Sequence, residues 1–121
     1  MTQSQSDKAN QFRAPARGAG RIRHRECRGW LLGTDDGRAR VHALATSSGA
    51  SAGMLGRRDG RVARDEALAQ ARVICGATDL PVSADLEKGF GDAPEIVAET
   101  IRLAAESGLV GCSIIGVALM P

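Results

Sequence analysis

Apolar and polar positions follow two different periods in the second part of the chain. Short, nearly continuous apolar runs predict buried strands at residues 41–49, 80–87 and 110–119. Between the first two runs, residues 65–77 carry apolar side chains at helical spacing, and acidic residues open the stretch as the helix dipole favours. The residues on the apolar face of this predicted helix are Leu68, Ala71, Ile74 and Cys75.

A second predicted helix lies between the second and third runs. It starts at Asp92-Ala93-Pro94-Glu95, which has the spacing of a capping box, and Gly108 closes it. Its inward-facing residues are expected to be Val97, Ile101, Ala104 and Ala105. The order strand, helix, strand, helix, strand predicts parallel strands joined by right-handed crossovers. The fold class is therefore α/β, and the pattern leaves open a doubly wound sheet or part of a barrel.

Residues 1–40 differ in character from residues 41–121. The segment from 17 to 40 shows neither helical nor strand periodicity, and we predict that 1–40 is a basic, poorly ordered segment. It carries nine Lys/Arg against four Asp/Glu, whereas the rest carries seven against ten. This asymmetry is typical of a basic arm for nucleic acid, with Arg21, Arg23, Arg25 and Arg28 as contacts, or of an Arg-rich segment without a packed role.

Composition narrows the functional classes. Aromatic residues make up only 2% of the chain, which argues against a platform that stacks nucleic-acid bases. The three cysteines, Cys27, Cys75 and Cys112, form no CxxC pair, so a disulfide framework or structural zinc site is disfavoured. Cys75 and Cys112 lie in apolar runs and are expected to be buried. With no signal peptide or membrane span in the pattern, we expect a cytoplasmic protein.

The residues best suited to chemistry follow the second predicted strand. Because side chains alternate along a strand, Ser83, Asp85 and Glu87 are expected to point to one face. Two carboxylates at the C-terminal end of a parallel strand lie where such sheets place active sites, and hard oxygen ligands suit Mg²⁺. The alternative is a pair of solvated carboxylates at a strand end.

Three stretches together carry a family resemblance: ALATSSGASAGMLGRRDG, DEALAQAR and ATDLPVSADLEKGFGDAPEIVAETIRLAAESGLVGCSI. They resemble the isocitrate lyase / phosphoenolpyruvate mutase superfamily, in particular its carboxyphosphonoenolpyruvate phosphonomutase-like branch. The resemblance covers residues 43–114 and implies a partial (β/α)₈ TIM barrel of about three βα units. It also implies an Mg²⁺-dependent enzyme that acts on a small 2-oxo or 2-hydroxy acid. A C–C or P–C bond would be cleaved or formed through an enolate.

The resemblance assigns roles to six residues. Asp85 and Glu87 match the paired metal-binding carboxylates, and Asp59 matches an acidic residue that supports the metal through water. The residues that match the loop for the substrate carboxylate are Ser47, Ser48 and Gly49. The alternatives are a turn aspartate before glycine and an ordinary polar turn.

The chain also departs from the family pattern. Family members continue after Ser-Ile with Glu-Asp, and that Glu completes the metal shell, whereas Ser113-Ile114 is followed here by Ile115. The chain has 121 residues, whereas a complete barrel needs about 250. We therefore predict a truncated fragment that is inactive alone and that self-associates through exposed strand edges.

The codons permitted for residues 20–42 offer an explanation for the Arg-rich segment. Read in a frame shifted by one nucleotide, they allow a sequence similar to the family's first strand and helix, with its Asn-Ala-x-Asp…Gly-Ser-Ala-Arg pattern. We interpret the segment as the product of compensating frameshifts, with a third disruption after Ile114. On this interpretation the basic charge needs no nucleic-acid partner.

Overall fold

A computed structural model describes residues 3–17, 24–27 and 42–115. The strands of this part of the chain are β1 (His24–Cys27), β2 (Ala43–Thr46), β3 (Val82–Asp85) and β4 (Gly111–Ser113). The helices are α1 (Gln5–Arg17), α2 (Ser48–Met54), α3 (Arg64–Ala77) and α4 (Pro94–Glu106). The strands and helices predicted after residue 41 are thus β2, α3, β3, α4 and β4, with α2 in addition.

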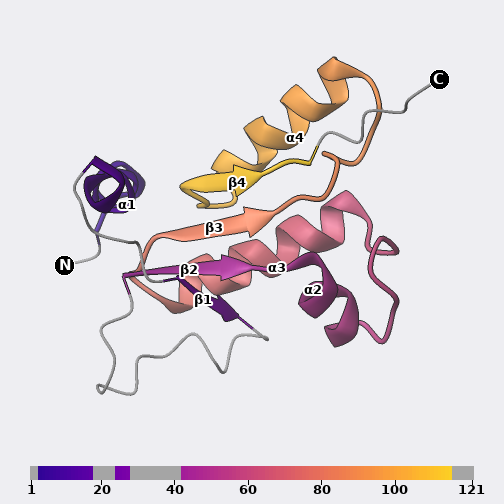
Figure 1. Ribbon diagram of the computed structural model, residues 1–121, viewed down its shortest axis with the longest axis horizontal. Coiled ribbons are helices and arrows are strands. Elements are labelled where there is room, and N and C mark those ends of the chain that lie inside the picture. Colours follow the sequence, from indigo (N-terminus) through magenta and orange to yellow (C-terminus); the bar gives the residue numbers. More distant parts are fainter. Residues whose placement is uncertain (1–2, 18–23, 28–41, 116–121) are drawn as a thin grey trace.

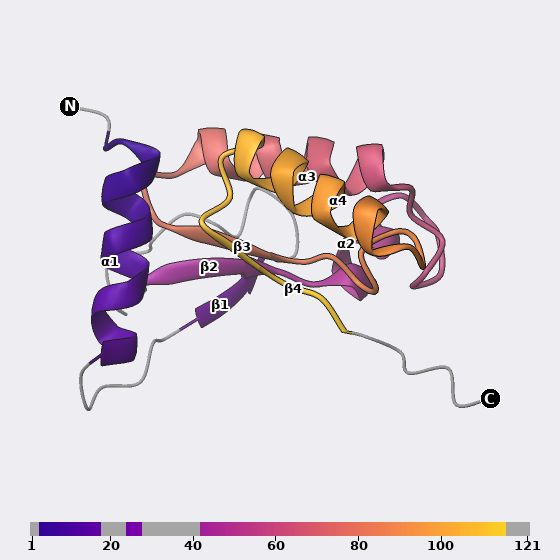
Figure 2. The ribbon, with the colours of Figure 1, turned by 90° about the horizontal axis from the view of Figure 1, so that it is seen from above.

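The strands form one parallel sheet in the order β1-β2-β3-β4, which is also their order in the sequence (Figure 1). Helices α3 and α4 both cover the same face of the sheet (Figure 2). A doubly wound sheet reverses its strand order and carries helices on both faces, whereas a barrel is wound in one direction only. The structure therefore confirms the α/β class and resolves the open alternative in favour of a partial (β/α)₈ barrel.

The hydrophobic core lies between the sheet and the two long helices. Along β3, Val82 and Ala84 are buried against the helices, while Ser83 and Asp85 face the opposite side and are half-buried. The cluster that fills the core is aliphatic throughout and consists of Leu44, Leu68, Ala71, Ile74, Val82, Ala84, Leu86, Ala104 and Leu109. The predicted apolar face of α3 is confirmed, with Cys75 half-buried at its border.

Helix α4 is rotated relative to the sequence-based expectation. Its buried residues are Thr100 and Ala104, whereas Ile101 is 47% exposed. Ile101 lines a hollow of about 130 Å³ beside β4, the outermost described strand on that side of the sheet. Ala104 was correctly predicted to face the core. The prediction for Ile101 was wrong, because its side chain points to the flank where the next βα unit of a barrel would pack.

Two local predictions around this helix also need correction. The capping box is not formed, because the N-cap of α4 is Ala93 and no side chain bonds to it. Asp92 instead forms an ion pair with Lys88 across 3.0 Å. Cys112, expected to be buried, is exposed, because β4 has no neighbouring strand beyond it among the described residues.

Regular structure also occurs before residue 41, where none was expected. Helix α1 lies across the N-terminal ends of the strands (Figure 2). Gln5 Nε2 donates to the carbonyl oxygens of Ala105 (2.6 Å) and Leu109 (2.9 Å), and Lys8 Nζ donates to that of Thr78 (3.2 Å). A helix held by tertiary hydrogen bonds of this kind needs no apolar stripe, so the sequence of α1 shows no helical period of apolar residues. Strand β1 has the sequence HREC and pairs through its main chain with β2, which requires no particular side chains.

The prediction that Arg21, Arg23 and Arg28 contact nucleic acid concerns residues that lie outside the described part of the chain. Within the described part of the chain, no helix is long and apolar enough to cross a membrane.

Candidate functional site

The segments that follow β2 and β3 lie at the same end of the sheet, opposite α1 (Figure 1). Ser47 directly follows β2 and is the N-cap of α2, with its backbone extended (φ −119°, ψ 143°). Its Oγ accepts a hydrogen bond of 3.1 Å from the amide of Ala50. Ser48 and Gly49 form the first turn of α2. The three predicted substrate-binding residues are therefore contiguous at a helix start beside the strand ends.

The loop after β3 is tightly folded. Asp85 ends the strand, and its Oδ1 accepts a hydrogen bond of 2.9 Å from the amide of Glu87. Glu87 has a positive φ of 54°, a left-handed conformation that is uncommon for a residue other than glycine. Glu87 therefore lies in a turn beyond the strand, and the alternation that was expected to align it with Ser83 and Asp85 ends before it.

Asp59 reaches the same place from the turn between α2 and α3. The pKa of Glu87 is raised by partial burial and, after that, by the negative charges of Asp59 and Asp85, while a hydrogen bond from the Gly60 amide opposes the shift. A β-carbon placed on Gly49 would lie 3.8 Å from Asp59 Oδ2. The structure thus places Asp59 and Asp85 near enough to Glu87 for their charges to act on it, and sets Gly49 beside Asp59.

Serine and threonine side chains share this end of the sheet with two of the carboxylates. A narrow hollow of about 10 Å³, room for about one water-sized group, is lined by Thr46, Ser48, Asp85 and Glu87 together with apolar neighbours. Among the described residues, no three Asp, Glu, His or Cys side chains are close enough together to hold a metal ion in common. The metal-binding and substrate-binding roles of these residues remain predictions.

The main chain of Ile115 pairs with that of Glu87. The parallel hydrogen-bond ladder continues past β4, where the Leu86 amide donates to Ser113 O (3.0 Å) and the Ile115 amide donates to Glu87 O (2.8 Å). The Ile115 side chain is 65% exposed. The residue that departs from the family pattern therefore lies beside Glu87, where it supplies no oxygen ligand.

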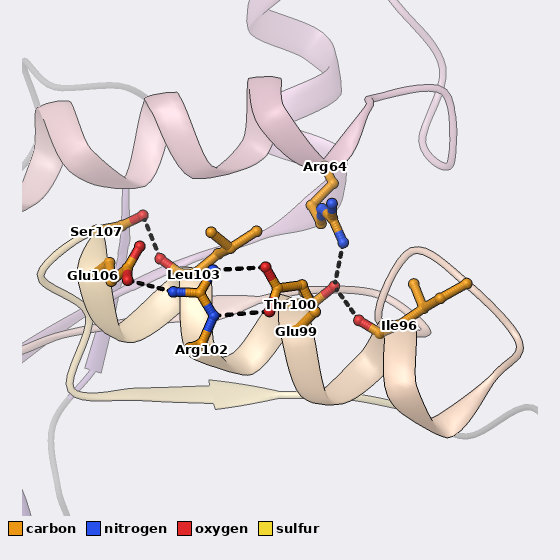
Figure 3. Close-up of polar contacts among 8 residues, drawn as sticks. All are labelled: Arg64, Ile96, Glu99, Thr100, Arg102, Leu103, Glu106 and Ser107. Atoms are coloured by element: carbon orange, nitrogen blue, oxygen red, sulfur yellow. Dashed lines mark hydrogen bonds and ion pairs between the residues drawn. The ribbon is translucent and has the colours of Figure 1, made fainter.

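Sequence reasoning missed one buried polar residue that bonds to the loop after β3. Thr100 of α4 is fully buried, and its Oγ1 donates to the carbonyl oxygen of Gly89 in the β3–α4 loop across 2.8 Å. Figure 3 shows its contacts with Arg64 and Ile96. The signal in the sequence was a threonine four residues before the buried Ala104, on the helix face that packs against the sheet.

A parallel sheet wound in one direction, with helices on one face and polar residues at the C-terminal ends of its strands, is the architecture of part of a (β/α)₈ barrel. The chain belongs to the phosphoenolpyruvate phosphomutase family, whose model matches residues 34–115. Compared with curated protein sequences, the chain has no significant match.

Solved structures agree with this family. A proposed lyase/mutase from Burkholderia cenocepacia is 44% identical, with a TM-score of 0.81 over 91% of this chain and 39% of its own. A proposed phosphonomutase from the same organism is 34% identical, with a TM-score of 0.82 over 89% of this chain and 44% of its own. A phosphoenolpyruvate phosphomutase from Streptomyces platensis is 25% identical, with a TM-score of 0.77 over 93% and 42%. The chain therefore spans about two fifths of the length of these relatives.

Proposed function

We propose that the chain carries part of the site of an Mg²⁺-dependent lyase or phosphonomutase that acts on small 2-oxo or 2-hydroxy acids. In this proposal Asp85 and Glu87 bind the metal and Asp59 supports it through water. The residues that contact the substrate carboxylate are Ser47, Ser48 and Gly49. Mg²⁺ bound here would supply a Lewis acid that polarises a substrate oxygen.

One observation carries the proposal: acidic side chains from two separate loops converge at the strand ends. The negative charges of Asp59 and Asp85 both raise the pKa of Glu87. Mutual repulsion of this kind is unfavourable in a structural role, whereas a cation between the carboxylates would offset it.

The donor set fits Mg²⁺ better than a softer metal. All candidate ligands are oxygen atoms, and Mg²⁺ usually takes one or two carboxylates while keeping several waters. A site with two carboxylate ligands would rely on water for most of its remaining ligands. Such a site is expected to be weak.

Ile115 is the second reason to expect weak binding and no turnover by this chain alone. A side chain without oxygen stands beside Glu87, where the family pattern has a third carboxylate. The chain covers 39% and 44% of the two relatives from Burkholderia cenocepacia, so the activity of a whole family member is not assigned to it. We therefore propose that this chain does not convert substrate unaided.

Restoring the carboxylate at position 115 tests the proposal. We expect Ile115→Glu to tighten Mg²⁺ binding about tenfold in titration calorimetry, because a negative charge about 4 Å from a divalent cation contributes about 2 kcal/mol in water. Ile101→Glu is the matched control, since Ile101 is also exposed but lies on α4 beside β4. It adds the same charge without a ligand at the site.

Two results would contradict the proposal. One is an Ile115→Glu protein that binds Mg²⁺ no better than the Ile101→Glu protein. The other is a sub-millimolar Mg²⁺ site in the unmodified chain that disappears in Asp85→Ala, which would show that the site is intact. Phosphorus NMR of phosphoenolpyruvate incubated with the unmodified chain and Mg²⁺ should show no conversion.

A further inference from the structure

Thr100 stands out as a buried hydroxyl that bonds outside its own helix. It is 0% exposed, and its Oγ1 lies 2.8 Å from Gly89 O and 3.0 Å from Ile96 O. A hydroxyl has one proton, and the nearer acceptor belongs to the β3–α4 loop rather than to the preceding turn of α4. The bond therefore fastens the loop to the helix.

The loop needs such a fastening because its backbone is strained. Glu87 (φ 54°) and Phe90 (φ 63°) both adopt left-handed conformations, each at a cost of about 1–2 kcal/mol for a residue with a side chain. Gly89 lies between them and packs so closely on α4 that a β-carbon there would lie 2.9 Å from Val97 Cγ2. Strained turns of this kind persist only where their surroundings fix them.

The segment that carries Asp59 also meets Thr100. Arg64 is the first residue of α3 and follows Asp59 after four residues, and its Nη1 lies 3.5 Å from Thr100 Oγ1 (Figure 3). This bond is long, and the hydroxyl accepts it while donating to Gly89. Thr100 is thus the point on α4 where the Asp59 segment and the Glu87 loop come together.

We propose that Thr100 is a positioning residue, which fixes the left-handed turn at Glu87 and so sets the Glu87 carboxylate relative to Asp59 and Asp85. The importance of that placement for chemistry rests on the proposed function. The placement itself does not, because the hydrogen bonds exist without a metal.

Hydrogen–deuterium exchange of the metal-free protein tests the placement. Thr100→Val keeps the shape and removes the hydroxyl, and we expect amide exchange at Glu87 and Gly89 to rise at least about tenfold, as loss of a buried hydrogen bond implies. Thr100→Ser retains the hydroxyl and is expected to stay within about twofold of the unmodified protein. Rescue by serine separates the hydrogen bond from the packing of the methyl group.

Ser107→Ala is the matched control. Ser107 is 4% exposed on the same helix, and its Oγ donates to Leu103 O across 2.9 Å (Figure 3). The substitution removes a part-buried hydrogen bond at the C-cap of α4 that does not touch the β3–α4 loop. Equal loop exchange in the Thr100→Val and Ser107→Ala proteins would overturn the proposal, as would loop exchange in Thr100→Val that matches the unmodified protein.

A second readout links the placement to the site. In the Ile115→Glu background, adding Thr100→Val should weaken Mg²⁺ binding at least about threefold, while adding Ser107→Ala should not. If Ile115→Glu gains no affinity, the proposed function fails, and the exchange experiment still decides the role of Thr100. If Thr100→Val does not fold, NMR of the unmodified protein tests the role of Thr100 instead. A Thr100 hydroxyl proton protected from water supports the proposal, and one that exchanges rapidly contradicts it.

Discussion

Glu87→Gln is expected to stabilise the protein at neutral pH, although it removes a candidate metal ligand. The folded state holds this carboxyl near Asp59 and Asp85 and partly away from water, so its pKa is raised above the ordinary value of 4.5. A raised folded pKa means that the contribution to stability is fully present below the unfolded pKa. It is lost as the pH rises from about 4.5 through the folded pKa. At neutral pH the charge on Glu87 therefore opposes folding.

The size of the effect follows from the exposure of the cluster. The carboxylates are only partly buried, so solvent screens their repulsion, and the free energy of unfolding should rise by about 0.5 kcal/mol in total. For a domain of this size that corresponds to about 2–4 °C in Tm. Glutamine keeps a side-chain oxygen for the Gly60 amide and leaves the positive φ at Glu87 unchanged, so the charge is the main variable.

Thermal melts followed by circular dichroism at pH 7.5 and pH 4 measure this difference. We expect the gain in Tm at pH 7.5 and little at pH 4, where the Glu87 carboxyl of the unmodified protein is largely protonated in both the folded and the unfolded state. Asp79→Asn is the control, because Asp79 is an exposed acidic residue in the turn before β3. A loss of Tm in Glu87→Gln at pH 7.5, or an equal gain at both pH values, would refute the reasoning.

Two further predictions concern the core and the uncovered flank of α4. Leu44→Ala removes a side chain that is 1% exposed, and the free energy of unfolding should fall by about 3–5 kcal/mol in urea titrations, whereas Val73→Ala on the exposed side of α3 should change it little. A loss below about 1 kcal/mol for Leu44→Ala would place Leu44 outside the core. Ile101→Lys should reduce self-association in light scattering at micromolar concentration, because it places a charge in the apolar hollow beside β4. Val73→Lys is its control, and an equal reduction by both would point to net charge rather than to this surface.

The sequence predicts the elements whose side chains carry their own periodic signal. Strands β2 and β3 and helix α3 each bury an apolar run or stripe, so local pattern and tertiary packing agree. Helix α1 and strand β1 escape prediction because tertiary contacts hold them. Gln5 and Lys8 bond to distant carbonyl oxygens, and β1 pairs through its main chain. Ile101 was misplaced because its partner in a full barrel is not among the described elements.

The residues of the candidate site also differ in whether the local sequence pattern indicates them. The pair Asp85 and Glu87 is visible in the sequence from its spacing and its position after a strand. The approach of Asp59 to Glu87 is not, because it depends on how the turn between α2 and α3 folds over the strand ends. The resemblance to a family supplied Asp59, and the structure shows its charge acting on Glu87. Thr100 is hidden for a similar reason, since only the three-dimensional loop shows what its hydroxyl holds.

The strained loop and the gathered carboxylates are best explained together. Two left-handed residues and the repulsion at Glu87 each lower stability, while Thr100, Asp85 Oδ1 and the ladder at Ile115 hold the arrangement in place. Stability alone would favour relaxing both features, for example by glycine at 87. Their retention is typical of a site whose cost is offset when a cation binds. Under the proposed function, isoleucine at position 115 would leave the strain and the repulsion in place while supplying no oxygen ligand to offset them.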